Sequence, residues 1–292
     1  IIKSNSRFFI DSRAKQKIIM MRKKLKQLID KNRVMYGINT GFGELANKTI
    51  SKDKLKQLQL NLIRSHACGV GKALSDDEVR LLMFIRVNEL ARGASGVRVE
   101  IVEKLCEFLN KGVIPYIPEK GSVGASGDLA PSSHMALCLI GEGFAKLVGN
   151  YRFEPTKKIL KKLSIKPIVL EEKEGLALIN GTQATTAIGS LALLKGLKVF
   201  HSSVVAGALS VDALKGTDAC FDPRISELKP HPGQIYVAKK LRELLDGSEI
   251  LRSHKTNDNR VQDPYSLRCM PQVMGAVMDN LYHCVNIVEN EY

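Results

Sequence analysis

Residues 121–131 read Gly-Ser-Val-Gly-Ala-Ser-Gly-Asp-Leu-Ala-Pro, and the Ala125-Ser126-Gly127 core of this stretch can form an electrophile from backbone atoms. Protein side chains supply nucleophiles and acids, so electron-sink chemistry normally needs a cofactor. The amide nitrogen of Gly127 can attack the carbonyl carbon of Ala125 and close a five-membered ring with loss of water. Dehydration of Ser126 then leaves a methylidene-imidazolone, which is a strong electrophile.

The residues around this tripeptide suit such a cyclisation. Gly127 lacks a Cβ atom and tolerates tight backbone geometry, and Gly121 and Gly124 allow the loop to bend. Asp128 follows directly and either assists proton transfers or caps the helix expected to begin there. A second Ala-Ser-Gly at residues 94–96 is interpreted as a helix-breaking turn, so the prediction depends on the long stretch and not on the tripeptide.

A glycine-rich loop, Tyr36-Gly-Ile-Asn-Thr-Gly-Phe-Gly43, offers a second reactive group. A phenol is ordinarily a poor base, with a pKa of about 10. Burial beside an electrophile and cationic groups would allow Tyr36 to take a proton from a substrate. The alternative is a structural tight loop, and Gly41 and Gly43 fit either interpretation because a lid also needs hinges.

Two polar side chains interrupt apolar helical segments. His66 lies in Ser65-His-Ala-Cys-Gly-Val-Gly71, and its imidazole can hydrogen-bond a polar ring. Asn180 lies in Leu178-Ile-Asn-Gly-Thr-Gln183, where a buried amide would need hydrogen-bonding partners. A structural histidine and a helix-capping asparagine are the alternatives.

The last stretch with chemical potential is Gln262-Asp-Pro-Tyr-Ser-Leu-Arg268. A guanidinium binds a carboxylate through two parallel hydrogen bonds, which a single lysine cannot do. Arg268 is therefore a candidate for holding a substrate carboxylate, and a surface arginine after a helix-capping loop is the alternative.

These five stretches, in this order along the chain, resemble the motifs of the aromatic amino acid ammonia-lyases. The resemblance implies a methylidene-imidazolone cofactor formed without added metal or nucleotide. It implies the following site residues: Tyr36 as the base that removes the β-proton; Ala125, Ser126 and Gly127 as the cofactor precursors, with Asp128 supporting their cyclisation; and His66, Asn180, Gln262, Tyr265 and Arg268 as substrate-binding residues.

The segment around His66 bears on the substrate. Family members of the phenylalanine type have a Phe-Leu pair here and those of the tyrosine type have His-Leu, so Ser65-His66-Ala67 resembles the histidine type most. The resemblance implies non-oxidative deamination of L-histidine to trans-urocanate and ammonia. The alternatives are a tyrosine or phenylalanine ammonia-lyase, an aminomutase, or a truncated non-catalytic chain. Addition of the substrate amine or of its ring to the electrophile stays open.

The family assembles as a homotetramer with active sites shared between subunits, and its members continue into a C-terminal helical region that supplies a further Phe and Glu. Nothing after Tyr292 is present here to match that region. The chain also begins at Ile1 without an initiator Met, and apolar helical spacing continues at Val285 and Val288. We therefore expect the chain to be part of a longer polypeptide.

Composition narrows the function classes. The 292 residues are 44% hydrophobic, enough for a sizeable core, and no apolar run approaches the roughly 18 residues of a membrane helix. The six cysteines show no zinc-ligand spacing, which favours reduced thiols in a cytoplasmic protein. The net charge of +14 raises the alternative of a nucleic-acid partner. Positive residues alternate with apolar ones at helical spacing, however, which favours a solvated surface.

Helix dominates the hydrophobic pattern, and we predict a mainly α fold. The resemblance implies a long-helix bundle of the fumarase/aspartase-like type, with a loop-rich N-terminal region over 1–110 and a central bundle over 111–292. Helices are predicted over residues 12–29, 51–65, 75–90, 97–109, 128–147, 177–214, 237–245 and 267–292, with loops over 112–127, 218–233 and 248–263. The 177–214 segment is apolar nearly all round, which is typical of a buried helix.

Overall fold

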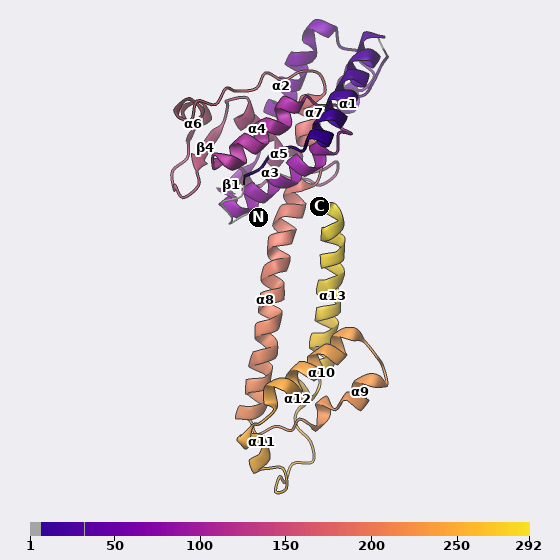
Figure 1. The fold of residues 1–292 in the computed structure, drawn as a ribbon, viewed down its shortest axis with the longest axis vertical. Helices are drawn as coiled ribbons and strands as arrows, with labels where there is room; N and C mark the ends of the chain where they lie inside the picture. The colour runs from indigo at the N-terminus through magenta and orange to yellow at the C-terminus, as the bar shows by residue number, and fades with distance from the viewer. Residues whose placement is uncertain (1–6, 32) are drawn as a thin grey trace. The chain divides into compact units, whose positions relative to one another are not determined.

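A computed structural model describes residues 7–31 and 33–292 (Figure 1). The chain forms two compact units, one of residues up to 188 together with Tyr292, and one of residues 189–291. The sequence had predicted a division near residue 110. The Tyr36, His66 and 121–131 segments all lie in the first of these units.

The first unit is mainly helical with two small antiparallel sheets, β1–β3 and β2–β4–β5. Its elements are α1 (Ser12–Asp30), η1 (Gly43–Leu45), η2 (Lys52–Lys54), α2 (Leu55–His66), β1 (Val70–Ala73), α3 (Asp76–Ala91), α4 (Val99–Asn110), β2 (Val113–Pro115), β3 (Pro118–Lys120), α5 (Leu129–Leu139), β4 (Phe144–Leu147), β5 (Glu154–Pro155), α6 (Thr156–Lys162) and α7 (Glu174–Ile179). Its core contains fully buried side chains from α3 and α4, among them Leu82, Leu90, Ile101 and Leu105.

Local sequence signals account for several of these helices. Asp11 caps α1 by accepting from the backbone of Arg13 and Ala14, and Ser75 and Glu78 form the predicted capping box at the start of α3. The predicted cap at Ser51 is wrong, because η2 lies between it and α2, and Lys54 is the N-cap without a side-chain hydrogen bond.

Two further predictions were wrong around the small sheets. The expected loop over 112–127 contains β2 and β3. The helix expected over 128–147 ends at Leu139 and is followed by β4. Gly141 and Gly143 have φ values of 83° and 67°, which a right-handed helix cannot accommodate, so the chain turns there.

The second unit contains the greater part of α8 and the helices after it. Its elements are α8 (Gln183–Ala213), which begins in the first unit, η3 (Ala219–Phe221), α9 (Pro223–Glu227), α10 (Pro232–Leu245), α11 (Glu249–Ser253), α12 (Tyr265–Arg268) and α13 (Met270–Glu291). The loops expected over 218–233 and 248–263 thus contain η3, α9 and α11. The backbones of Gly233 and Gly275 approach so closely that a Cβ on either would collide with the other helix, which explains the tight packing of α10 on α13.

The predicted helix over 177–214 is interrupted, and its all-round burial is not found. Asn180, Gly181 and Thr182 separate α7 from α8. One stripe of α8 enters the core of the second unit through Phe200, Val204, Ala208 and Val211. Apolar residues on its other sides, Leu194, Val199, Val205 and Leu209, are exposed.

The segment Glu174–Ala213 is also long and apolar enough to span a membrane by length and composition alone. Only 17% of its most apolar window is buried. Lys195 and Lys198 interrupt its apolar sequence, so the segment contains no uninterrupted apolar run of that length. A single segment of this kind is weak evidence for a membrane helix, since long helices of soluble proteins pass the same test.

Candidate active site

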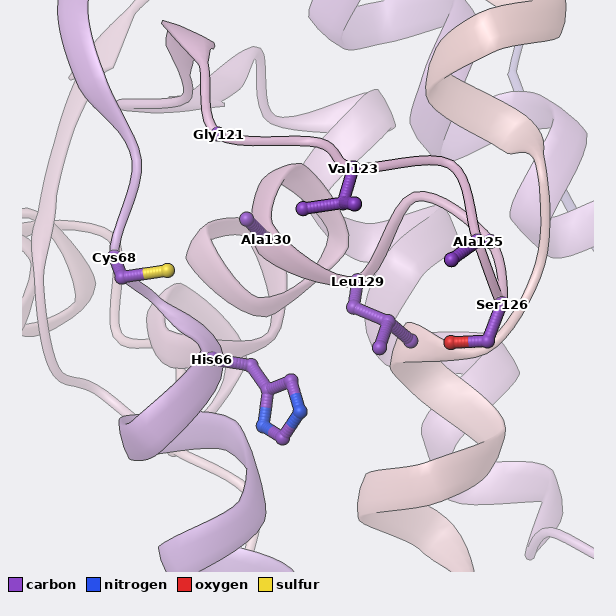
Figure 2. A pocket seen from close by; sticks show the side chains of 9 residues that line it. His66, Cys68, Gly121, Val123, Ala125, Ser126, Leu129 and Ala130 are labelled. Atoms are coloured by element: carbon purple, nitrogen blue, oxygen red, sulfur yellow. The ribbon is translucent and has the colours of Figure 1, made fainter. Parts of the chain in front are cut away.

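A small pocket brings together two of the segments singled out in the sequence. It has a volume of about 130 Å³ and is lined by His66, Cys68, Gly121, Val123, Ala125, Ser126, Gly127, Leu129 and Ala130. Figure 2 shows the Ser126 side chain pointing toward Leu129, on the side of the pocket where the His66 ring lies. The last turn of α2 and the 121–130 loop therefore form one surface.

The loop backbone fits the cyclisation chemistry at Gly127. This residue has a φ of 106°, and a Cβ built on it would lie 2.7 Å from the carbonyl oxygen of Gly181. Only glycine can occupy this position, because any side chain would collide with the turn between α7 and α8. The amide of the next residue, Asp128, donates to the same Gly181 oxygen at 2.6 Å.

Asp128 holds this loop against the start of α8. Its carboxylate is 3% exposed and accepts from the Thr185 backbone amide at 2.6 Å, the Thr185 hydroxyl at 2.8 Å and the Ser122 hydroxyl at 2.8 Å. It makes no side-chain capping bond to α5, which it precedes. The expectation that Asp128 caps the following helix is therefore wrong, since it binds a free amide in the first turn of α8 instead.

Replacing Asp128 tests this anchoring role. Asp128→Asn should lower the free energy of unfolding by about 2–4 kcal/mol, because a neutral amide loses charge-assisted bonds to buried donors. Urea unfolding followed by circular dichroism measures the change. Asp53→Asn, at an exposed carboxylate in η2, is the matched control and should change it little; equal losses in both variants would contradict the assignment.

The hydrogen bonds of His66 define which ring nitrogen faces a ligand. Its Nδ1 lies 2.9 Å from the carbonyl oxygen of Leu62 and 3.1 Å from the Ser65 hydroxyl. A carbonyl oxygen can only accept, so Nδ1 carries the proton and Nε2 of the neutral ring is an acceptor. His66 is thus suited to bind a ring that donates a hydrogen bond, such as an imidazole N–H or a phenol O–H.

A second histidine, which the sequence did not single out, supports the segment after His66. His134 on α5 accepts the backbone N–H of Gly69 on its Nε2 at 3.0 Å. Burial lowers the pKa of His134 below its usual 6.5. Protonation of Nε2 would remove this hydrogen bond, so the neutral ring belongs to the folded state.

This arrangement predicts a pH-dependent contribution to stability. Because the pKa of His134 in the folded protein is below the 6.5 of the unfolded chain, its contribution is complete above pH 6.5. It is lost as the pH falls through 6.5 and the lowered pKa. Compared with His134→Gln, the wild type should lose more unfolding free energy between about pH 7.5 and 5.5. Parallel pH dependences in urea titrations would contradict this.

Tyr36 lies in a hydrogen-bonded turn and does not line this pocket. Met35 donates its amide to the Asn39 side chain at 2.7 Å, and Gly37 donates to the Thr40 hydroxyl at 3.0 Å. The Tyr36 side chain is 58% exposed, and its hydroxyl accepts from the Gly43 amide at 3.3 Å. The burial expected for Tyr36 is therefore not found, and the side chains of Asn39 and Thr40 shape the loop.

Asn180 ends α7 and its side chain is exposed, so the buried amide expected there is wrong. Its backbone carbonyl accepts from Arg86 Nη1 at 3.2 Å. The exposed side-chain amide of Asn180 can contact a ligand, while Arg86 holds the backbone of this residue. Arg86 carries no motif signal in the sequence other than a charge within the apolar pattern of α3.

The remaining predicted residues lie in the second unit. Gln262 and Arg268 line an open pocket of about 960 Å³ between α10, α11 and the 256–263 loop, and the Tyr265 side chain is exposed at the start of α12. Asp263, which is buried, accepts from the Thr217 amide at 2.6 Å and pairs with Arg260. The Asp263 carboxylate thus positions the 262–268 motif. The only sequence signal for this role is that Asp263 lies within the motif.

The chain is similar to known proteins along its whole length. A family model described as aromatic amino acid lyase matches residues 1–292. Histidine ammonia-lyase of Legionella pneumophila (strain Corby) is 50% identical over 88% of this chain and 50% of its own length. The chain spans about half the length of the curated relatives it matches.

Solved structures agree with this similarity. The crystal structure of histidine ammonia-lyase from Trypanosoma cruzi is 38% identical, with a TM-score of 0.87 over 99% of this chain and 53% of the other. Phenylalanine aminomutase of Pantoea agglomerans is 33% identical, with a TM-score of 0.90 over 99% of this chain and 58% of the other. The mainly helical fold expected from the sequence is thus confirmed.

Proposed function

This chain belongs to the aromatic amino acid lyase family, and we propose that it serves the non-oxidative deamination of L-histidine to trans-urocanate and ammonia. The observation that carries the proposal is the shared pocket of His66 and Ala125-Ser126-Gly127. It places a side chain that can select a polar ring beside a tripeptide that can become an electrophile. The 50% identity to a histidine ammonia-lyase supports the same substrate.

The family uses a methylidene-imidazolone cofactor, and we assign its formation here to Ala125, Ser126 and Gly127. The close approach of Gly181 to Gly127 supports this, because it leaves room for a glycine only. The cofactor would supply an electrophile that makes loss of ammonia easier. We assign no metal or nucleotide to the reaction.

The protein's side chains bind and orient the substrate around this centre. His66 Nε2 would accept a hydrogen bond from the substrate ring, and Asn180 would contact the amino acid group. Gln262, Tyr265 and Arg268 lie in the second unit, and we propose that another subunit of the homotetramer brings them to this centre. There Arg268 would bind the α-carboxylate in a two-point contact, with Gln262 and Tyr265 lining the same site.

Proton removal is assigned to the phenol of Tyr36. The β-proton of the amino acid must leave for the double bond of the product to form, and Tyr36 is the residue of the described chain that we assign to this step. Because its side chain is exposed in the chain alone, we propose that other chains of the assembly help to enclose it. We propose a homotetramer with shared active sites, in which subunit contacts cover the exposed apolar residues on α8. We propose that this assembly is cytoplasmic. No membrane or nucleic-acid partner is assigned.

A turnover assay on the full-length protein tests the function. Histidine, tyrosine and phenylalanine are supplied side by side, and the ultraviolet band of each conjugated acid product is followed. Histidine should give by far the largest kcat/KM. A dominant tyrosine or phenylalanine product would overturn the substrate assignment. Formation of mainly a β-amino acid would instead identify an aminomutase, the alternative that the similarity to the Pantoea enzyme favours.

A truncated, non-catalytic chain is the remaining alternative. Intact mass distinguishes it, because cyclisation and dehydration remove two waters from Ala125-Ser126-Gly127. A full-length protein with the unmodified mass and no turnover of any of the three amino acids would exclude the proposed enzyme.

A further inference from the structure

A buried arginine lies behind the candidate active site and outside the motifs of the family resemblance. Arg86 on α3 is 1% exposed, and its Nη1 donates to the carbonyl oxygens of Ala177 and Asn180 at 3.2 Å each. The same nitrogen pairs with Glu89 at 2.9 Å. A buried charge is costly unless it is paired and hydrogen-bonded, so these contacts hold the side chain in one place.

Gln183, the first residue of α8, completes the arrangement. Its side-chain oxygen accepts from Arg86 Nη2, and its side-chain nitrogen donates to Glu89. Burial lowers the pKa of Arg86 to about 10, against the opposing effects of Glu89 and Asp128. The guanidinium therefore stays charged at neutral pH. We call Arg86, Glu89 and Gln183 the Arg86 cluster.

The Arg86 cluster touches the turn that holds the electrophile-forming loop. A Cβ built on Gly181 would lie 2.9 Å from Arg86 Nη2 on one side. On the other side, Gly181 contacts Gly127 and accepts the amide of Asp128 at 2.6 Å. Gly181 thus lies between the guanidinium and the loop and is close to both.

We propose that the Arg86 cluster is a positioning element for cofactor formation. It fixes the 180–182 turn, and that turn holds the Gly127 nitrogen in the geometry for attack on the Ala125 carbonyl carbon. This inference rests on the proposed function of Ala125-Ser126-Gly127. Arg86 itself does not contact the reacting atoms and acts through Gly181.

The reaction that the cluster assists needs no other reagent. As the bond from the Gly127 nitrogen to the Ala125 carbon forms, the amide proton passes to the Ala125 oxygen. That oxygen leaves as water with the amide proton of Ser126. Ser126 then loses its hydroxyl group and its Cα proton as a second water, which leaves the methylidene without any oxidant or reductant.

Cofactor formation can be measured apart from catalysis by the intact mass of the full-length protein. Arg86→Met should reduce the rate at which folded protein becomes lighter by two waters at least tenfold, because the turn loses its support. Arg86→Lys should restore part of that rate, since an ammonium can reach one of the acceptors but lacks the planar fork. Thermal unfolding monitored by circular dichroism reports separately on folding.

Arg22→Met is the matched control. Arg22 on α1 is also buried and paired, with Glu171 at 2.6 Å and Glu172 at 2.9 Å, but it contacts neither the turn nor the loop. This variant should form the cofactor at the wild-type rate even if it is destabilised. Equal rates in Arg86→Met and wild type would overturn the inference.

Two other outcomes are also decisive. If Arg86→Met does not fold, Gln183→Leu removes the same contact from the other side and should slow the mass change. Failure of both to fold, with Arg22→Met folded, would make the cluster a stability element and overturn its positioning role. A wild-type protein that never loses the two waters would instead refute the proposed function, which keeps the two failures distinguishable.

Discussion

Ser126→Ala should abolish turnover of histidine, with kcat reduced by at least about 10³-fold, because an electron sink that side chains cannot replace is lost. The alanine has no hydroxyl group to leave as water, so the methylidene cannot form. Ser126 lines the pocket with its side chain pointing inward and is not needed for the core. The variant should therefore fold normally and bind substrate while remaining inactive.

The second Ala-Ser-Gly of the chain provides an internal control for this variant. Ser95→Ala makes the same chemical change at residues 94–96, where Gly96 is in a turn that contacts Leu25. It should keep both the wild-type rate and the loss of two waters. Wild-type turnover in Ser126→Ala would refute the electrophile, whereas matching losses in both variants would indicate a general effect on folding.

Tyr36→Phe should reduce kcat by about 10²–10⁴-fold, the usual contribution of a positioned general base. The hydroxyl accepts one hydrogen bond, from the Gly43 amide at 3.3 Å, and the ring packs edge-on against Phe42. Phenylalanine keeps the ring contact and loses only the weak hydrogen bond. The unfolding free energy should therefore change by less than about 1 kcal/mol, and KM should change much less than kcat.

Tyr151→Phe is a matched control because the Tyr151 ring is 99% exposed. It should leave both kinetic constants unchanged. Retention of kcat within threefold in Tyr36→Phe would assign proton removal to another group. A loss confined to KM would mean that Tyr36 binds the substrate and does not take its proton.

Local signals in the sequence predicted much of the first unit. The capping box of α3 and the amphipathic pattern of α1 depend on residues three to four positions apart, and both helices are found where expected. The glycines at 141 and 143 ended α5 earlier than the apolar pattern indicated. Short-range pattern thus identified the helices better than it identified their ends.

The candidate pocket was predicted in part. Placing His66 and Ser126 in one site depended on the family resemblance, and the structure brings the two segments to one pocket. The roles of Tyr36, Asn180 and Arg268 stay predictions. The burial predicted for Tyr36 and for α8 was wrong. The type of a residue indicates which contacts it favours, but it does not indicate whether its own chain or another chain provides them.

By itself, the sequence determined which residues can do chemistry and the order in which they occur. It also explained why residue 127 is a glycine, since a side chain at this position would hinder the cyclisation. Only the tertiary structure decided what holds them. Asp128 binds Thr185 across 57 residues, and Arg86 supports Asn180 across 94.

The physical reason lies in the range of the interactions. Helix caps and amphipathic stripes arise from neighbours along the chain, so they can be predicted from spacing. A buried guanidinium or carboxylate finds its partners only when helices pack, because each must satisfy its hydrogen bonds within whatever surrounds it. The 121–131 loop therefore has its candidate reactive residues in one short stretch of sequence, whereas its supports at Gly181, Thr185 and Arg86 come from elsewhere in the fold.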